Sequence, residues 1–253
     1  MAKSLFICFA AEDRYRIVEP VVFHLKNYGI NMWYDRYSLI MGDDRIQKNL
    51  IEGASTCKYA VVIISEFTSL SHCAMEELSI IRERHYRGDV TIFPIIYELS
   101  ADKIPTTLAW IKELIFKEAN RHSGTYEICN HIACKITGDA LQKYEYQNIR
   151  DITTYLSNQL PMATYRILMD YQGIDSSNLN SKVSMLYAAH ITIKVLMTAS
   201  EAPLIAMIFC IFERLFCETK LNLSVDYREL WLLENSMCIL VNQYINYCTE
   251  SKI

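Results

Sequence analysis

Glycine and proline are scarce in this sequence, which has seven and five of them among 253 residues. Six of the glycines lie at or before Gly138, and only Gly173 lies in the remainder. A segment rich in turns is therefore followed by a long segment with few chain breakers. Because 253 residues correspond to one large domain or two small ones, we predict two domains, at 1–140 and 141–253.

The sequence has neither a basic region nor a long hydrophobic run. Lys and Arg number 25 against 29 Asp and Glu, and no Lys/Arg-rich run occurs, which disfavours nucleic-acid binding. The longest apolar run, 202–212, is far shorter than the roughly 20 residues of a transmembrane helix, so we expect no membrane anchor. A hydrophobic content of 51% with 21% charged residues indicates a folded globular protein.

Cysteine is present, but its pattern predicts neither disulfides nor a metal site. The nine cysteines are an odd number, no CxxC motif occurs, and we recognise no signal peptide. We therefore expect reduced thiols in a cytoplasmic protein. Cys129, His131 and Cys134 form the only tight Cys/His group, and they lack a second pair at zinc spacing. We interpret the group as one face of a helix and expect no metal ion.

Motifs of several enzyme classes are missing as well. The absence of GxGxxG and GxxxxGK[ST] disfavours Rossmann-type dinucleotide binding and P-loop nucleotide hydrolysis. The absence of HExxH and GxSxG gives no support to zinc-protease or serine-hydrolase chemistry.

Apolar runs alternate with helical patterns about five times in the first half of the chain. The runs predict strands at 5–9, 30–34, 59–65, 90–96 and 114–116. Pro94 indicates that the fourth strand ends there or lies at an edge. The alternation predicts a parallel sheet flanked by helices, with binding sites beyond the C-terminal ends of the strands.

Helical patterns account for the rest of the sequence. One helix is expected at 71–86 with Ser69 or Ser71 as its N-cap, and one at 125–136 that stops at Gly138. The second half predicts a compact helical bundle with helices near 142–160, 181–197, 202–218 and 226–248. It contains no recognisable chemical motif, and its apolar segment 202–212 is interpreted as a buried helix or an oligomer interface.

Several short motifs resemble the Toll/interleukin-1 receptor (TIR) domain, in order and at the right spacing over about 4–138. They are Phe6-Ile7-Cys8-Phe9 with Glu12-Asp13, Gly29-Ile30 through Trp33-Tyr34-Asp35, Met41-Gly42-Asp43, Ser65-Glu66-Phe67 through Cys73-x-x-Glu76, Phe93-Pro94-Ile95-Ile96, and Leu108-Ala109-Trp110. The resemblance implies a flavodoxin-like TIR domain with a five-stranded parallel sheet flanked by helices. An all-α C-terminal domain would follow it.

The resemblance also implies an activity. Enzymatic TIR domains cleave NAD⁺ at the bond between nicotinamide and ribose, with NAD⁺ as the substrate and neither a metal nor a redox cofactor. Their glutamate lies three residues after the Cys, which is Glu76 here, and a carboxylate stabilises the cationic ribose. Glu77 lies about 100° around the helix, so only one of the two can face the cleft; the spacing favours Glu76. The alternative is that Glu76 is an ordinary acidic residue near a helix N-terminus.

Five further residues are candidate substrate contacts: Phe9, Ala10, Trp33, Arg36 and His72. His72 occupies the place of the family tryptophan, and it either packs at the helix start or stacks on a substrate ring. For Phe9 and Trp33, the alternative that they belong to the sheet core or its rim is favoured over substrate contact. Ala10 lies where some relatives carry a larger polar or basic residue, so few groups are available to bind the substrate phosphates. Arg36 either supplies such a group or is a solvated charge of the loop.

The loop at 38–44 has a second implied role, because in the family it bridges neighbouring TIR domains. Its candidate interface residues are Leu39, Ile40, Met41, Gly42 and Asp43. The alternative is that the apolar tip tucks onto its own domain.

The resemblance therefore predicts a cytoplasmic bacterial protein that consumes NAD⁺ in antiphage defence. Its product would be ADP-ribose or a cyclic isomer that activates a separate effector, and the protein would self-associate through its TIR domain and its helical domain. Two alternatives are a non-catalytic scaffold that binds other TIR domains and a host-directed virulence factor.

Overall fold

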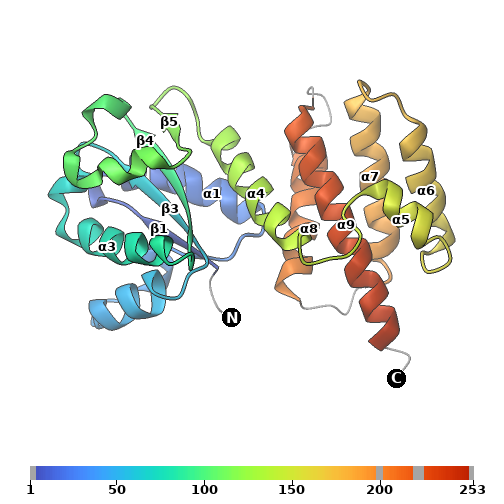
Figure 1. The fold of residues 1–253 in the computed structure, drawn as a ribbon, viewed down its shortest axis with the longest axis horizontal. Coiled ribbons are helices and arrows are strands. Elements are labelled where there is room, and N and C mark those ends of the chain that lie inside the picture. The colour runs from blue at the N-terminus through green and yellow to red at the C-terminus, as the bar shows by residue number, and fades with distance from the viewer. Residues whose placement is uncertain (1–3, 198–201, 219–224, 251–253) are drawn as a thin grey trace. The chain divides into compact units, whose positions relative to one another are not determined.

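The computed structural model describes residues 4–197, 202–218 and 225–250, which form two compact units (Figure 1). The first unit runs up to Lys26 and continues over Ile30–Cys129; the second comprises Asn27–Gly29 and the chain from Asn130 onward. The division thus falls at Cys129, eleven residues before the predicted boundary at 140. The later turns of the helix at this point belong with the second unit, as the bond from Cys134 Sγ to the carbonyl of Arg228 shows.

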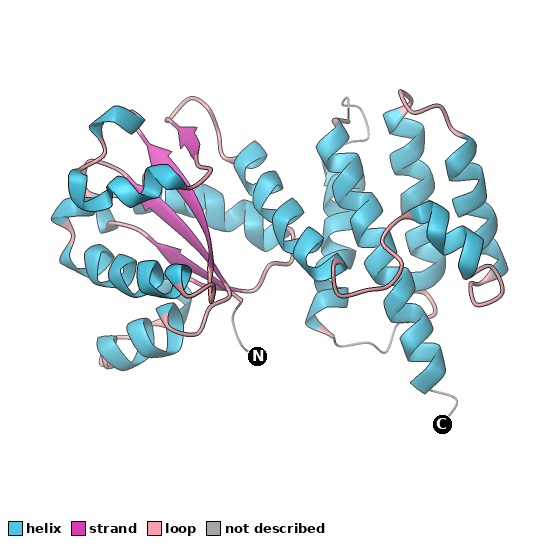
Figure 2. Cartoon of the chain, viewed as in Figure 1, coloured by secondary structure: helices cyan, strands magenta, loops and turns pink. Residues whose placement is uncertain are grey.

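A five-stranded parallel sheet forms the centre of the first unit (Figure 2). Its strands are β1 (Leu5–Cys8), β2 (Met32–Trp33), β3 (Tyr59–Ile64), β4 (Thr91–Tyr97) and β5 (Lys117–Ala119), in the order β2-β1-β3-β4-β5. Every residue of β1 and β3 is buried, as expected for apolar strands covered on both faces. The predicted flavodoxin-like sheet is confirmed.

Helices connect the strands of this unit. The α-helices are α1 (Glu19–Asn27), α2 (Asp35–Ser38), α3 (His72–Tyr86) and α4 (Tyr126–Leu141). The π-helical segments are η2 (Arg14–Val18) and η3 (Ile46–Ala54). The 3₁₀-helical segments are η1 (Ala11–Asp13), η4 (Thr68–Leu70), η5 (Ala101–Lys103) and η6 (Thr106–Glu113). The side chain of Ser71 accepts a hydrogen bond from the backbone N–H of Ala74. The predicted start of α3 is therefore confirmed, with Ser71 as its N-cap.

Of two strand predictions, the edge position of Pro94 is confirmed and the bounds of the fifth strand differ from the structure. Pro94 lies in the middle of β4, which pairs with β3 on one side and β5 on the other. Proline is tolerated because the pairing with β5 begins only at Ile95, so β4 is locally an edge at Pro94. The fifth strand lies at Lys117–Ala119 rather than at 114–116, where Ile115 is exposed.

A close contact beneath the sheet makes Gly53 a sensitive position. A β-carbon there would lie 2.8 Å from Cε2 of Phe6 and 3.0 Å from Trp33. We expect Gly53→Ala to destabilise the protein by about 1–2 kcal/mol, because overpacking a buried site forces its neighbours to shift. Urea unfolding measures the effect against Gly173→Ala, whose new methyl group meets no atom within 4 Å. Equal stabilities of the two variants would contradict this expectation.

The second unit is helical and is organised around one long helix. Its elements are the later part of α4, α5 (Ile149–Tyr155), α6 (Met162–Gly173), α7 (Leu179–Lys194), α8 (Pro203–Glu213), η7 (Arg214–Glu218) and α9 (Tyr227–Glu250). The helix α9 packs against α5, α7 and α8 (Figure 1). The all-α second half is thus confirmed.

Three helix boundaries in this unit differ from the predictions. α4 continues through Gly138 to Leu141, and the indole of Trp231 packs at this glycine, where an added β-carbon would lie 3.2 Å from its ring. The helix expected at 142–160 is confined to Ile149–Tyr155, where Asn148 caps its start. The helix α6 was not predicted because Pro161 looked like a break, whereas Pro161 is the N-cap residue and the helix begins directly after it at Met162.

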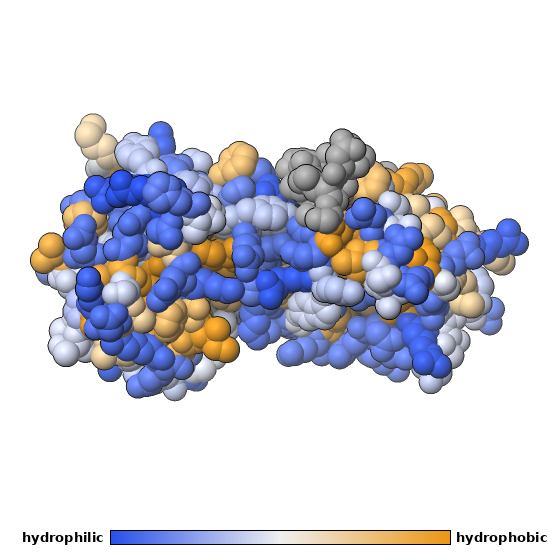
Figure 3. Space-filling model, turned by 90° about the horizontal axis from the view of Figure 1, so that it is seen from above, coloured by the Kyte–Doolittle hydropathy of each residue, from blue (hydrophilic) through white to orange (hydrophobic). Residues whose placement is uncertain are grey.

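The described helices do not meet the requirements of a membrane span. None of them combines the length and the apolar composition that crossing a membrane requires. On the face seen in Figure 3, hydrophilic residues cover much of the surface and hydrophobic residues form separate groups between them.

Candidate active site

The candidate site lies where the two central strands end. β1 and β3 are neighbours, and the chain continues to β2 on one side of this pair and to β4 on the other. Ligands of such sheets bind beyond the carboxyl ends of the strands where the strand order reverses. Phe9 and Ala10 follow β1 at this edge, Ser65 follows β3, and α3 begins a few residues later. The acidic pair Glu76-Glu77 lies in the first turns of α3.

Glu76 is partly exposed and ion-paired. Its side chain is 35% exposed, and its Oε2 accepts a hydrogen bond of 2.6 Å from Nη2 of Arg45. Nδ1 of His72 lies 3.5 Å from the same oxygen. The hydrogen bond to Glu76 raises the pKa of the Arg45 guanidinium. The pair joins the segment before η3 to the start of α3.

Glu77 lies in a different environment, since only 7% of it is exposed. Its Oε1 accepts a hydrogen bond of 2.5 Å from Nδ2 of Asn49, whose Oδ1 accepts one of 3.1 Å from the indole N–H of Trp33. Burial raises the pKa of Glu77 to about 7, although hydrogen bonds from Cys8 and Asn49 oppose the shift. A carboxyl group with this pKa exchanges its proton near neutral pH, which is a common property of catalytic acids and bases.

Glu77, and not Glu76, is the member of the pair that turns toward the sheet. Glu76 keeps the more accessible position, and its predicted contact with substrate, based on the distance from Cys73, stays a prediction. The periodicity of α3 explains the burial of Glu77, because the buried residues of this helix follow helical spacing: Ala74, Glu77, Leu78, Ile81 and Arg84. The apolar members of that stripe already place position 77 on the inner face.

The other predicted substrate contacts fall into separate environments. Trp33 is connected to Glu77 through Asn49, and His72 lies beside Glu76. Ala10 has no exposed surface. In this conformation its side chain therefore does not line an open site.

Phe9 and Arg36 each lie beside an ion pair: Phe9 contacts Arg14, which is paired with Asp35, and Arg36 is paired with Glu19. Arg14, which the sequence reading missed, donates hydrogen bonds of 2.7 and 2.6 Å to the two carboxylate oxygens of Asp35. Its guanidinium lies 5.0 Å from the ring centre of Phe9. Arg36 donates a hydrogen bond of 2.7 Å to Glu19. A phosphate contact by Arg36 would therefore require this ion pair to open.

A buried carboxyl group connects the ends of β1 and β3. Asp13 is fully buried, and its Oδ2 accepts a hydrogen bond of 2.6 Å from Oγ of Ser65. Burial raises the pKa of Asp13. This contact fixes the two segments that follow the central strands, a role that spacing in the sequence did not reveal.

The predicted interface loop presents two apolar side chains to solvent. Ile40 and Met41 are exposed, whereas Leu39 packs against the core of the first unit. Asp43 closes the turn, since its carboxylate accepts a hydrogen bond of 2.8 Å from the backbone N–H of Ile40. Gly42 has a φ of +100°, which favours glycine. The tucked arrangement thus applies to Leu39 alone.

The described part of the chain contains no cluster of metal ligands. Within it, no group of three or more His, Cys, Asp or Glu side chains is arranged to hold a metal ion. Among the cysteines whose side chains the structure describes, none forms a disulfide, and most are buried.

Comparison with known protein families agrees with this fold. Residues 5–124 match the family described as the TIR domain. The sheet order, the flanking helices and this match together identify the first unit as a TIR domain.

The TIR segment is also similar to curated bacterial proteins. It is 32% identical over 101 residues to the 2' cyclic ADP-D-ribose synthase BtTIR of Bacteroides thetaiotaomicron and 31% identical over 101 residues to the 2' cyclic ADP-D-ribose synthase AbTIR of Acinetobacter baumannii. It is 31% identical over 102 residues to the NAD(+) hydrolase TcpC of Escherichia coli. Each alignment covers 40% of this chain and 35%, 37% and 33% of the respective relative. The chain therefore spans only about a third of the length of these relatives.

Proposed function

We propose that this protein cleaves NAD⁺ at the bond between nicotinamide and ribose. The observation that carries the proposal is a buried carboxyl group, Glu77, at the strand-order reversal of a TIR domain, with a pKa of about 7. The relatives named as NAD(+) hydrolases and cyclic ADP-ribose synthases support the same substrate. NAD⁺ is the substrate in this proposal, and the proposed chemistry uses only groups of the protein.

The proposed cleavage requires few catalytic groups. When the C–N bond breaks, nicotinamide leaves as a neutral molecule and the ribose becomes an oxocarbenium-like cation. A carboxylate beside the ribose stabilises that charge, as in glycoside hydrolysis. Attack by water yields ADP-ribose, and attack by a hydroxyl group of the same molecule yields a cyclic isomer.

We assign the carboxylate role to Glu77 and a positioning role to Glu76. Glu77 faces the sheet edge, whereas Glu76 is bound to Arg45. Because little of Glu77 is exposed, substrate contact requires the segment around Arg45 and Asn49 to move. The ion pair between Arg45 and Glu76 holds that segment against α3, so its opening would accompany substrate binding.

The test is NAD⁺ turnover at high protein concentration, followed by chromatography with mass detection. Nicotinamide release by the wild-type chain, lost when the carboxyl group is replaced, is the expected result. The mass and retention of the second product separate hydrolysis from cyclisation. If no nicotinamide is released, even after addition of an extract from phage-infected cells, the proposed activity is contradicted.

The proposal extends to a role in bacterial antiphage defence in the cytoplasm. Relatives named as cyclic ADP-ribose synthases come from bacteria, and a small diffusible product suits a signal that activates a separate effector. Plaque assays with the wild-type gene and the carboxylate variant test this role. Equal protection by both genes would contradict a signal made by this site.

Self-association through the loop is a second part of the proposal. Ile40 and Met41 are exposed apolar residues on one turn, so we expect Ile40→Ser with Met41→Ser to weaken assembly at least tenfold, because apolar burial drives association. Sedimentation velocity measures it. Ile115→Ser is the matched control, since Ile115 is equally exposed but lies outside the loop. Unchanged assembly of the loop variant would contradict the interface.

The same loop favours the alternative of a non-catalytic TIR scaffold. Binding to other TIR domains that survives replacement of Glu77, in a protein that never releases nicotinamide, would establish the scaffold. A host-directed enzyme would use the same chemistry and differ only in where it acts.

A further inference from the structure

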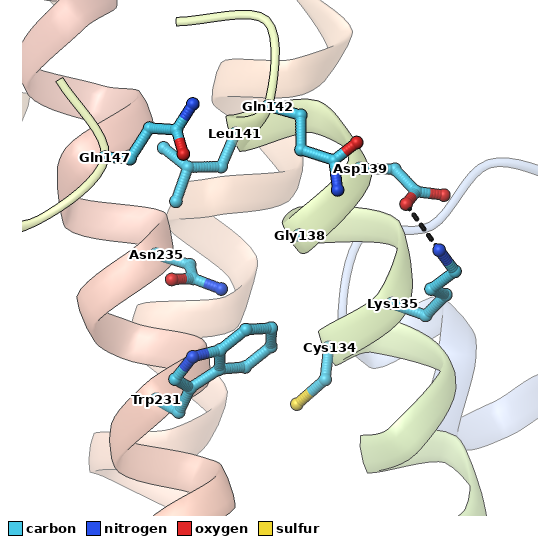
Figure 4. A pocket seen from close by; sticks show the side chains of 9 residues that line it. All are labelled: Cys134, Lys135, Gly138, Asp139, Leu141, Gln142, Gln147, Trp231 and Asn235. Carbon is cyan, nitrogen blue, oxygen red and sulfur yellow. Dashed lines mark hydrogen bonds and ion pairs between the residues drawn. The ribbon is translucent and has the colours of Figure 1, made fainter. Parts of the chain in front are cut away.

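A pocket of about 400 Å³ lies within the helical unit, between the later turns of α4 and the first half of α9 (Figure 4). Residues from both helices and from the loop after α4 line it, among them Cys134, Gly138, Gln142, Gln147, Trp231 and Asn235. Its volume is sufficient for a nucleoside-sized molecule. No residue of the TIR domain takes part.

An aromatic ring forms one wall of this pocket. Trp231 projects from α9 toward α4, and its indole is 45% exposed. The ring approaches the backbone of α4 at Gly138, where a side chain would lie 3.2 Å from it. Glycine in a helix interior costs about 1 kcal/mol relative to alanine. The close approach of the indole is a reason to retain glycine at this position.

A buried amide points into the same space. Asn235 is only 6% exposed, and its Nδ2 has no hydrogen-bond partner among the described residues. Figure 4 shows the amide directed from α9 into the pocket, next to the indole. An unpaired buried donor is unfavourable. A ligand with an acceptor atom at this point would satisfy it.

The charges of the lining select the kind of group that fits here. Lys135 and Asp139 neutralise each other through a hydrogen bond of 2.7 Å. Burial raises the pKa of Cys134 to about 12, so its thiol is neutral. Around the indole the remaining polar groups are carboxamides, which both donate and accept. An uncharged planar heterocycle with acceptor nitrogens matches this combination.

A second pocket adjoins the first and differs from it in charge. It shares Gln147, Trp231 and Asn235 with the first pocket. It adds two cationic side chains, Arg150 and Lys182, and one carboxylate, Glu234, which accepts a hydrogen bond from the hydroxyl of Tyr171. These cations suit phosphate groups. The two pockets together can therefore hold a base and the phosphates attached to it.

We infer that the helical unit binds a purine nucleotide, with the base against Trp231, an acceptor nitrogen on Nδ2 of Asn235, and the phosphates toward Arg150 and Lys182. A free nucleoside shares the base chemistry but lacks the phosphates. Adenosine and ADP-ribose therefore serve as the two probes. The inference concerns the helical unit alone and holds whether or not the TIR domain cleaves NAD⁺.

The experiment is calorimetric titration of the full chain with each probe, alongside the fluorescence of Trp231, the only tryptophan in the described structure that is substantially exposed. ADP-ribose is expected to bind saturably and to change the fluorescence. Adenosine is expected to bind more weakly, and Asn235→Leu to weaken both by about tenfold or more. Adenosine binding as tightly as ADP-ribose would overturn the phosphate part, and nicotinamide competing equally with adenosine would overturn the purine part.

The variants separate a ligand site from a structural role. Asn235→Leu removes an unpaired buried donor, so its melting temperature is expected to equal or exceed that of the wild type. Gly138→Ala pushes a methyl group against the indole and is expected to weaken binding severalfold, whereas Gly173→Ala changes nothing. The inference is overturned if neither probe saturates up to millimolar concentration, or if both Asn235→Leu and Gly138→Ala bind like the wild type.

Discussion

Replacing Glu77 by glutamine is expected to slow the proposed nicotinamide release by about a hundredfold or more, the typical cost of removing a group that stabilises charge in the transition state. Glutamine keeps the shape of the side chain and its acceptor for the amide of Asn49, but it carries no negative charge for the oxocarbenium-like ribose. The measurement is the rate of nicotinamide release from NAD⁺ at saturating substrate. A circular dichroism spectrum of each variant verifies that the fold is intact.

Glu76→Gln is the matched control, since it makes the same chemical change one residue earlier. It removes an exposed ion pair with Arg45, a kind of contact worth about 0–1 kcal/mol. We expect its turnover to stay within about tenfold of the wild type. In the wild type, kcat/KM should rise with pH and level off above about 7, because only ionised Glu77 is reactive. If Glu76→Gln released no nicotinamide while Glu77→Gln stayed active, the catalytic carboxylate would be Glu76.

The same Glu77→Gln variant is expected to be more stable than the wild type at pH 8, by up to about 3 kcal/mol. The folded state raises the pKa of Glu77 from its ordinary value of 4.5 to about 7, chiefly through burial. The folded protein therefore holds the proton more tightly than the unfolded chain. Ionising Glu77 destabilises the wild type as pH rises from about 4.5 to 7, and this cost is fully present above pH 7.

Urea unfolding at pH 5 and pH 8 measures this effect. The gain in Glu77→Gln should be small at pH 5 and largest at pH 8, whereas Glu76→Gln should show no comparable increase. A gain that is equal at both pH values would contradict the assignment of the raised pKa to Glu77. Together with a loss of turnover, this result would show that the ionised Glu77 lowers the free energy of unfolding while it is needed for catalysis.

Much of the fold could be predicted because local patterns and tertiary contacts agree. The wholly apolar run at β3 cannot be satisfied at a surface, and Ser71 supplies the cap that starts α3. Where the predictions failed, a distant contact had overridden a local signal. Gly138 looked like a helix end but accommodates the indole of Trp231, 93 residues away in the chain.

The candidate site shows the same division. Spacing from Cys73 identified the acidic pair and selected Glu76 as the member facing the cleft, but it did not reveal that Glu77 is the buried member. The buried stripe of α3 decides the matter, and Asn49 and Trp33 hold Glu77 in place. These partners come from η3 and β2, and no motif in the sequence connects them to α3.

The sequence by itself determined the strand–helix alternation, the parallel sheet, the capped start of α3 and the helical second half, because each depends on neighbouring residues and on hydrophobic periodicity. Only the tertiary structure decided which carboxyl group is buried, since a pKa depends on desolvation and on partners from other elements. The same holds for the pocket beside Trp231 and Asn235. Two helices far apart in the sequence create it, and neither helix contains it alone.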